Sequence, residues 1–470
     1  MNIVGQAGLV LCISLVQAVF STLLAIILAL PLAHFFYRYD FPFKRIVLAL
    51  ASLFFIMPTK LVILATSLFF GEHGFASIIF AHLMLNIPFA FYLFYLSYQK
   101  FDVTLEWVAH QLGATPWQHY STILFPLLRP TIISTASVIF LLCFSSFSIP
   151  LMLGGTWYHA TLEIMTFRMY QDGDAGATLI YTILRWMVVI PMLMVQARKS
   201  KTYSLITHYG LVWPVERFKV TSYSIIWLFY GLCIVYCTLG PLTVLVATSL
   251  HAQVFHYWSS IFFATTDPWL GVPVYRVIAN SVLLGIVSSF GAVLCGFILC
   301  YLLSRMVFLH ARMSGELLAA LSCILGSVGC GILFAWTSAL FFLPKFVLAV
   351  VCHLFLNYPF TYRIIRAQWY MYNQEWSFIA QSFGAPSAYV MRTLEIPFLK
   401  SAFIKAFCIG FGLSLTEVGA GAVLEDSIGL TMPMAIRIYR NQGAMHEALG
   451  MSLILVLLVV LLGLVLSARD

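Results

Sequence analysis

Long apolar runs dominate this chain, and short polar segments separate them. Leu9 to Phe36 and Met451 to Ser467 are two clear examples. A run of about 18 apolar residues is long enough for one helix to cross the hydrocarbon core of a bilayer. The pattern therefore predicts an all-α polytopic membrane protein with about eleven transmembrane helices.

The apolar runs fall into a group of five followed by a group of six. The first group covers roughly residues 7–37, 46–70, 75–98, 130–152 and 178–197. The second covers roughly 223–249, 276–304, 315–343, 346–365, 401–424 and 446–467. We therefore divide the chain into a first half at 1–197, a linker at 198–222 and a second half at 223–470.

Composition and charge agree with a membrane protein. The chain is 62% hydrophobic and 9% charged, whereas a soluble domain carries about 25% charged residues. With the N-terminus outside, sixteen Lys and Arg residues fall in cytoplasmic segments and only Arg168, Arg276, Arg437 and Arg440 fall outside. Because basic residues mark cytoplasmic loops, this predicts a periplasmic N-terminus, a cytoplasmic linker and a cytoplasmic C-terminus. The net charge of +8 is therefore explained by membrane orientation, and we expect the chain to contact lipid and not nucleic acid.

A repeat relates the two halves. Residues 81–130 align without a gap with residues 352–401, at a constant offset of 271. His82 pairs with His353 and Asn86 with Asn357, and a further pair, Ser14 and Ser281, follows at the nearby offset of 267. The topology gives both repeats the same orientation. Two fused membrane halves around one pathway is the usual reason for such a repeat, so we expect two pseudo-symmetric parallel repeats.

Each repeat contains a cytoplasmic loop with a short amphipathic helix. Apolar residues recur at helical spacing in both loops, which predicts one apolar stripe for each. The stripe is Leu105, Val108, Ala109 and Leu112 in the first loop, and Trp376, Ile379, Ala380 and Phe383 in the second. Gly113 and Gly384 follow where a helix favours a left-handed cap residue. A capped helix with one apolar face is typical of a docking element, and two like sites imply two like partners.

These loops resemble the coupling-loop motif of the permeases of ABC importers, E-A-A-x-x-x-G with a proline thirteen residues after the glycine. Gly113 to Pro126 and Gly384 to Pro397 have that spacing, and Ala109 and Ala380 take the second alanine position. Trp107 and Phe378 stand at the glutamate position, with acids nearby instead. The resemblance implies a type I ABC importer permease fold. It implies ATPase contacts at Glu106, Val108, Ala109, Leu112, Gly113, Ala114 and Pro126, and at Glu375, Ile379, Ala380, Phe383, Gly384, Ala385 and Pro397.

Further segments resemble the fused two-half permeases of thiamine importers. They are His82-x-x-x-Asn86-x-Pro88, Leu142 to Phe147, Leu153-Gly154-Gly155, Thr161 to Ile164 and Thr431-Met432-Pro433. The resemblance covers nearly the whole chain. It implies a multi-pass permease of the bacterial inner membrane, two copies of an ABC ATPase subunit at the cytoplasmic loops, and a periplasmic substrate-binding protein as the source of thiamine or its phosphates.

The chain shows no catalytic motif of its own. No G-x-x-x-x-G-K-[ST] stretch is present, so we expect the partner ATPase to use the ATP and Mg²⁺, with no cofactor bound here. The ten cysteines contain no C-x-x-C pair, and no metal site is predicted.

Ionisable residues inside spans are costly and mark candidate pathway positions. Glu417 lies within the tenth predicted span, and its partner in the repeat is Ser146, next to Phe147. These three are the candidate pathway residues. The alternative for Glu417 is a structural carboxyl that is hydrogen-bonded to a neighbouring helix. Lys60 and Arg185 are expected near span ends, with their charges reaching the interface.

Two other functions stay open at this point. Fused ferric-iron importer permeases share the same plan, so ferric iron is the second candidate substrate. An ion-driven secondary transporter would more often show an inverted repeat and paired intramembrane charges, and it is the less favoured reading.

Overall fold

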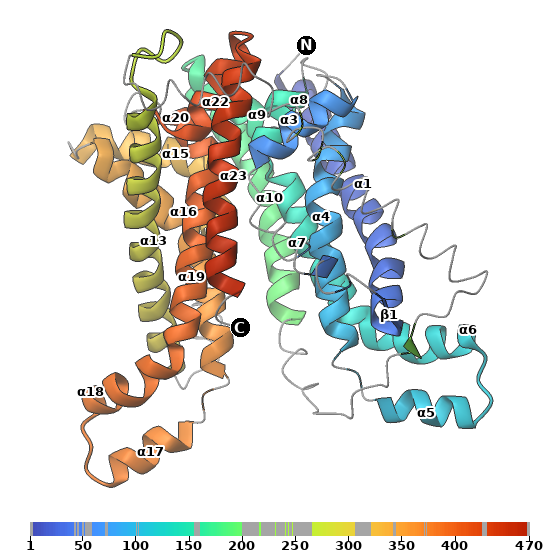
Figure 1. The fold of residues 1–470 in the computed structure, drawn as a ribbon. Coiled ribbons are helices and arrows are strands. Elements are labelled where there is room, and N and C mark those ends of the chain that lie inside the picture. Colours follow the sequence, from blue (N-terminus) through green and yellow to red (C-terminus); the bar gives the residue numbers. More distant parts are fainter. Residues whose placement is uncertain are drawn as a thin grey trace. The chain divides into compact units, whose positions relative to one another are not determined.

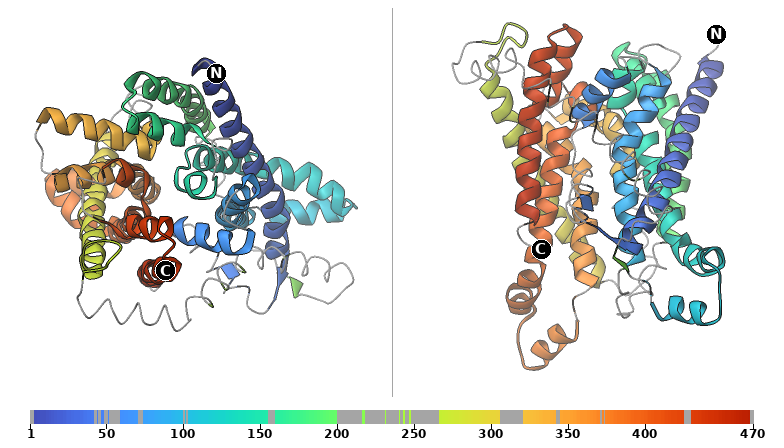
Figure 2. Two further views of the ribbon diagram at one scale, coloured as in Figure 1. Left: turned by 90° about the horizontal axis from the view of Figure 1, so that it is seen from above. Right: turned by 45° about the vertical axis from the view of Figure 1, so that its right-hand side comes forward.

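The computed structural model describes residues 3–41, 59–70, 74–99, 103–154, 160–199, 266–305, 321–341, 345–370, 374–424 and 430–467, with isolated residues between these stretches. The chain forms two compact units, Met1–Thr248 and Ser249–Asp470. Each unit is a bundle of long helices with shorter helices at its ends (Figures 1 and 2). The expected all-α fold is confirmed.

Unit 1 contains α1 (Ile3–Arg38), β1 (Tyr39–Asp40), α3 (Thr59–Phe70), α4 (Phe75–Tyr98), α5 (Val103–Gln111), α6 (Pro116–His119), the π-helical turn η2 (Tyr120–Leu124), α7 (Phe125–Phe144), α8 (Ser148–Leu153), α9 (Leu162–Gln171), α10 (Ala175–Lys199) and β2 (Glu216–Arg217). The two short strands pair in parallel, with Tyr39 opposite Glu216. The long helix α1 packs along α4 and α7, and α9 packs on α10.

Unit 2 contains α13 (Val274–Arg305), α15 (Leu321–Phe341), α16 (Lys345–Tyr370), α17 (Gln374–Ser382), α18 (Ser387–Val390), the π-helical turn η5 (Met391–Glu395), α19 (Ile396–Thr416), α20 (Gly419–Val423), α22 (Met432–Asn441) and α23 (Met445–Ser467). Its elements follow one another as their counterparts in unit 1 do. The helix α13 packs along α16 and α19, as α1 packs along α4 and α7 in unit 1. The helix α22 packs on α23, as α9 packs on α10.

A hydrogen bond present in both units confirms the repeat. The Ser14 hydroxyl on α1 accepts from the backbone N–H of Leu162 at 2.9 Å. The Ser281 hydroxyl on α13 accepts from the N–H of Met432 at 2.7 Å. In each case a serine of the first long helix satisfies a free N–H at the start of a short helix, where the helix itself offers no acceptor.

Among the described residues, seven helices are long and apolar enough to cross a membrane, and three shorter apolar helices are α3, part of α15 and part of α23. The sixth predicted span, 223–249, lies largely outside the described residues. The linker 198–222 does as well, so the domain boundaries near it stay a prediction.

Two predicted spans are not continuous. The span predicted at 130–152 consists of α7 and α8 with a break at Ser145–Phe147, and the span predicted at 401–424 consists of α19 and α20 with a break at Glu417–Val418. The short segments α8 and α20 pack on α3 and α15 respectively. Apolar side chains fill these contacts, including Ile149 in one unit and Ala420 in the other. Hydropathy missed the breaks because only a few polar residues interrupt a long apolar stretch in each case.

Two charged residues also differ from expectation. Arg185, expected near a span end, is 2% exposed in the middle of α10, and Glu163 is 1% exposed on α9. Their side chains form an ion pair of 2.7 Å between Nε and Oε1. The expectation that Arg185 reaches the interface is therefore wrong, because a carboxylate partner holds it inside the unit. Lys60 is also buried, on α3.

Candidate functional site

The loop helix of unit 1 exposes its apolar side chains. Along α5 and just after it, Leu105, Val108 and Leu112 are 47%, 53% and 81% exposed, and Trp107 is 55% exposed. Ala109, the remaining member of the predicted stripe, is buried at 6%. The helix thus leans on its own unit through a small residue and presents large apolar residues outward. The side chain of Glu106 lies outside the described residues.

The loop helix of unit 2 has the same character. Trp376 and Ile379 on α17 are each 52% exposed, Phe378 is 73% exposed, and Phe383 just after the helix is 89% exposed. Trp107 and Phe378 occupy the position where the motif has glutamate, so each loop replaces an acid with an exposed aromatic ring. Apolar groups of this size are rarely exposed together on a surface without a partner.

Both loop helices end on a glycine in the left-handed conformation. The φ angle is 75° at Gly113 and 87° at Gly384. The N–H after each glycine bonds back across the last turn, from Ala114 to the Ala109 carbonyl at 3.0 Å and from Ala385 to the Ala380 carbonyl at 3.1 Å. This is the Schellman arrangement of a helix end. The predicted cap conformation is confirmed at both positions.

A π-helical turn then joins each loop to its long helix, which the sequence reasoning missed. The N–H of Phe125 bonds to the Tyr120 carbonyl in η2, and the N–H of Ile396 bonds to the Met391 carbonyl in η5. The next residue is proline in both units, Pro126 or Pro397. Because proline has no N–H to donate, a regular α-helical bond at that point is lost. The proline of the motif was the available signal for this irregular turn.

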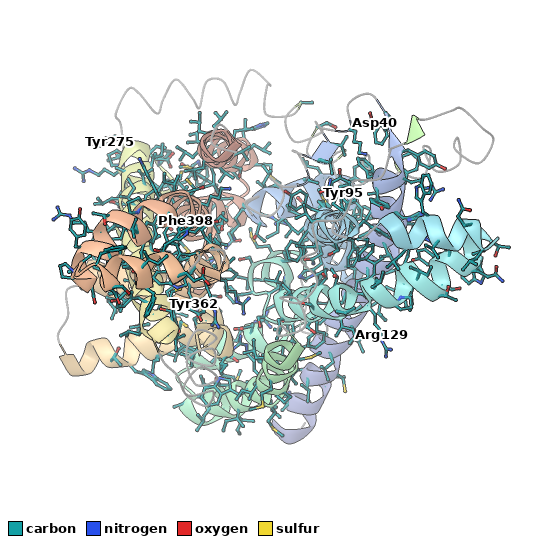
Figure 3. The ribbon with its side chains drawn as sticks, turned by 90° about the horizontal axis from the view of Figure 1, so that it is seen from below. Asp40, Tyr95, Arg129, Tyr275, Tyr362 and Phe398 are labelled. Atoms are coloured by element: carbon teal, nitrogen blue, oxygen red, sulfur yellow. The ribbon has the colours of Figure 1, made fainter. Side chains whose placement is uncertain are left out.

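Polar contacts hold the loop of unit 2 from inside. The hydroxyls of Tyr372 and Ser377 lie 2.8 Å apart, and Ser377 donates to Oε1 of Glu395 at 3.2 Å. Glu395 is 4% exposed, within η5. The Tyr372 ring packs on Phe398, with centroids 5.2 Å apart, and Figure 3 labels Phe398. At the offset of 271, unit 1 has Phe101, Glu106 and Leu124 instead.

The three candidate pathway residues lie at the breaks between α7 and α8 in unit 1 and between α19 and α20 in unit 2. Each broken pair corresponds to the fourth span of its repeat. Glu417 caps the break in unit 2, because its Oε1 accepts from the N–H groups of Val418, Gly419 and Ala420 at 2.9, 2.7 and 3.2 Å. In unit 1, Ser146 is partly buried. Phe147 is 3% exposed and packs edge-on against Phe167, with centroids 5.2 Å apart. Besides these bonds to its own following turn, Glu417 has a side-chain hydrogen bond with Ser327 of the neighbouring helix α15, as the structural alternative expected.

The described residues contain no group of His, Cys, Asp or Glu arranged to hold a metal ion. What the site offers instead is two exposed apolar loop surfaces, each on a rigid capped helix, at the ends of long helices. Such surfaces suit docking of another protein and do not provide chemistry.

Comparison with known proteins gives a consistent picture. Residues 8–203 match the family model described as the binding-protein-dependent transport system inner membrane component. The thiamine transport system permease protein ThiP of Haemophilus influenzae is 24% identical, over 97% of this chain and 87% of its own length. The protein of that name from Escherichia coli is 23% identical, over 94% and 86%. A probable sulfate transport system permease protein, cysT of Chlorokybus atmophyticus, is 24% identical but covers only 37% of this chain.

Proposed function

We propose that this chain, which belongs to the inner-membrane permease family of binding-protein-dependent importers, forms the translocation path of an ATP-driven importer for thiamine or its phosphates. Thiamine transport permeases of Haemophilus influenzae, Brucella abortus and Escherichia coli match 93–97% of the chain, in both halves and through the loops, and another relative of that name matches 39%. The relative named for sulfate matches only 37% of this chain. These coverages favour thiamine over sulfate as the substrate.

Two copies of one ABC ATPase subunit dock on the loops of α5 and α17. The observation that carries this proposal is the duplicated exposed apolar surface, with Leu112 at 81% and Phe383 at 89% exposure. Burying one such side chain in a partner's groove contributes about 1.5–3 kcal/mol. The same capped geometry in both units suits two identical partners. The permease itself then transmits the motion of the ATPase and hydrolyses nothing.

A periplasmic binding protein delivers the substrate to the opposite side. The basic residues favour cytoplasmic loops, a periplasmic N-terminus and a cytoplasmic C-terminus, so the breaks in the fourth helices lie toward the periplasm. There Glu417, Ser146 and Phe147 border the path. The carboxylate of Glu417 lowers the barrier for a cationic ligand such as thiamine, since charge in a low-dielectric channel acts strongly.

Reconstitution with the ATPase and binding protein encoded beside this gene tests the substrate. Labelled thiamine, thiamine phosphates and ferric iron are offered separately with ATP. We expect ATP-dependent uptake of thiamine or a phosphate of it. ATP-dependent uptake of ferric iron alone would replace thiamine by the alternative substrate.

Docking is tested by alanine substitution of matched exposed phenylalanines. Phe383→Ala removes the most exposed ring of the second loop, and Phe290→Ala removes a 68% exposed ring from α13, away from the loops. Phe383→Ala should lower the amount of ATPase that co-purifies with the permease at least tenfold, about 1.4 kcal/mol in binding. Phe290→Ala should leave it unchanged. Equal recovery of the ATPase with both variants would contradict docking at this loop.

A further inference from the structure

A buried ion pair joins α9 and α10 of unit 1. Glu163 lies in the first turn of α9 and Arg185 in the middle of α10, with 2.7 Å between Nε and Oε1 and exposures of 1% and 2%. A charge in a membrane span is expensive, and such residues are usually placed for function. A buried pair is also weak evidence for stability, because removing both charges is often neutral or stabilising.

Arg185 has a second contact that leads to the break in the fourth helix. Its terminal nitrogen Nη2 donates to the Ser145 hydroxyl at 3.1 Å. Ser145 is the first residue after α7, and the Ser145–Phe147 turn separates α7 from α8. The guanidinium therefore uses one face for Glu163 and another for the break, a geometry that its planar fork of donors allows.

Unit 2 shows that the repeat folds without this pair. The bond from Leu162 to Ser14 in unit 1 is equivalent to the bond from Met432 to Ser281 in unit 2. This equivalence aligns the sequence of α9 with that of α22 in the repeat. In that alignment Pro433 replaces Glu163 and Leu455 replaces Arg185. Leu455 is fully buried, so an apolar side chain fills the same place. The break of unit 2 is instead held by the carboxylate of Glu417, which accepts from its own backbone and bonds to Ser327 of α15.

We propose that Glu163 and Arg185 are positioning residues of the transport path, which hold the Ser145–Phe147 turn of unit 1 in its transporting geometry. The inference rests on the proposed transport function. Glu163 fixes the orientation of the guanidinium, the guanidinium fixes Ser145, and Ser145 fixes the turn that carries Ser146 and Phe147. The two halves thus fix equivalent breaks by different means. In unit 1 an arginine on α10 tethers the break, and in unit 2 a carboxylate at the break caps its own backbone and bonds to Ser327 of α15.

Hydrogen exchange measured by mass spectrometry in lipid nanodiscs tests the tether without any substrate. Ser145→Ala removes only the tether, and Arg185→Lys keeps the charge but replaces the fork with a single ammonium group. Both should speed exchange of the amides at 145–153 about tenfold, as expected for loss of one charge-assisted hydrogen bond. The amides at 417–424 in unit 2 serve as the internal control and should not change. Thr416→Ala, the equivalent substitution in unit 2, should leave the exchange at 145–153 unaltered.

Uptake per ATP hydrolysed then separates positioning from mere bracing. Ser145→Ala and the double variant Glu163→Leu with Arg185→Met should insert normally and keep ATPase binding, while thiamine uptake per ATP falls several-fold. Unchanged exchange at 145–153 in Ser145→Ala overturns the proposal, and so does faster exchange with unaltered uptake per ATP. If the double variant does not fold, Ser145→Ala alone decides. If the unmodified complex takes up no thiamine, the proposed substrate fails, and the ratio is measured with the ligand of the binding protein.

Discussion

Glu417 offers the clearest test of whether a charged residue at a helix break caps the backbone or also attracts a cationic substrate. Its Oε1 accepts three backbone N–H groups at 2.7–3.2 Å. Glu417→Leu leaves all three donors without that acceptor, and each unsatisfied buried donor costs about 1–3 kcal/mol. The expected loss of stability is therefore about 3 kcal/mol or more. Glu417→Gln keeps a carbonyl oxygen as acceptor and loses the charge, which halves the strength of such bonds. Its expected cost is about 1 kcal/mol.

Thermal unfolding in detergent and uptake in proteoliposomes, measured on both variants, separate the two roles. Capping alone predicts that Gln is mildly destabilised and transports thiamine normally, while Leu folds poorly. A pathway role predicts that Gln folds and binds the ATPase yet loses most uptake of the cation. Full uptake by Glu417→Gln would remove the pathway role. A Leu variant as stable as the unmodified protein would refute the energetic account of the cap.

Three further outcomes are expected. An added Cβ at Gly113 or Gly384 meets no atom within 4 Å. Alanine at both sites should therefore weaken ATPase co-purification only because a left-handed backbone costs a residue with a Cβ about 1–2 kcal/mol. Asparagine tolerates that conformation and should restore ATPase co-purification. Single cysteines placed in 198–222 should react with an impermeant thiol reagent only in inside-out vesicles, and labelling in right-side-out vesicles would reverse the topology. Glu395→Gln, which can still accept from Ser377, should keep ATP-driven uptake, whereas Glu395→Leu should lower uptake per ATP; equal values for the two would show that the contact is dispensable.

The sequence predicted well those features that periodicity and backbone chemistry determine. The span predicted at 75–98 is α4 at the same residues, and the cap glycines of both loops have the expected φ. Burial of Arg185 could not be predicted, because its partner Glu163 is 22 residues away and hydropathy carries no information on pairing. The helix breaks escaped for a related reason. Long apolar stretches flank the few polar residues at Ser145 and Glu417, so hydropathy predicts one span, and only the backbone of the structure shows that each helix ends there.

What the two halves share and what they do not follows from the symmetry of their proposed partners. Two identical ATPase subunits need two like surfaces, and the loop helices, cap glycines and π turns are present in both units. A small substrate without two-fold symmetry needs unlike surfaces, and the side chains around the breaks differ. Lys60 contacts Met152 in unit 1, while its counterpart Gly331 lies so close to α20 that a Cβ would stand 2.9 Å from the Cβ of Val423. Exchange of break residues between the halves should therefore impair uptake, whereas exchange of the cap segments should leave ATPase docking intact. Normal uptake after exchange of the break residues would argue that substrate contacts lie elsewhere in the chain.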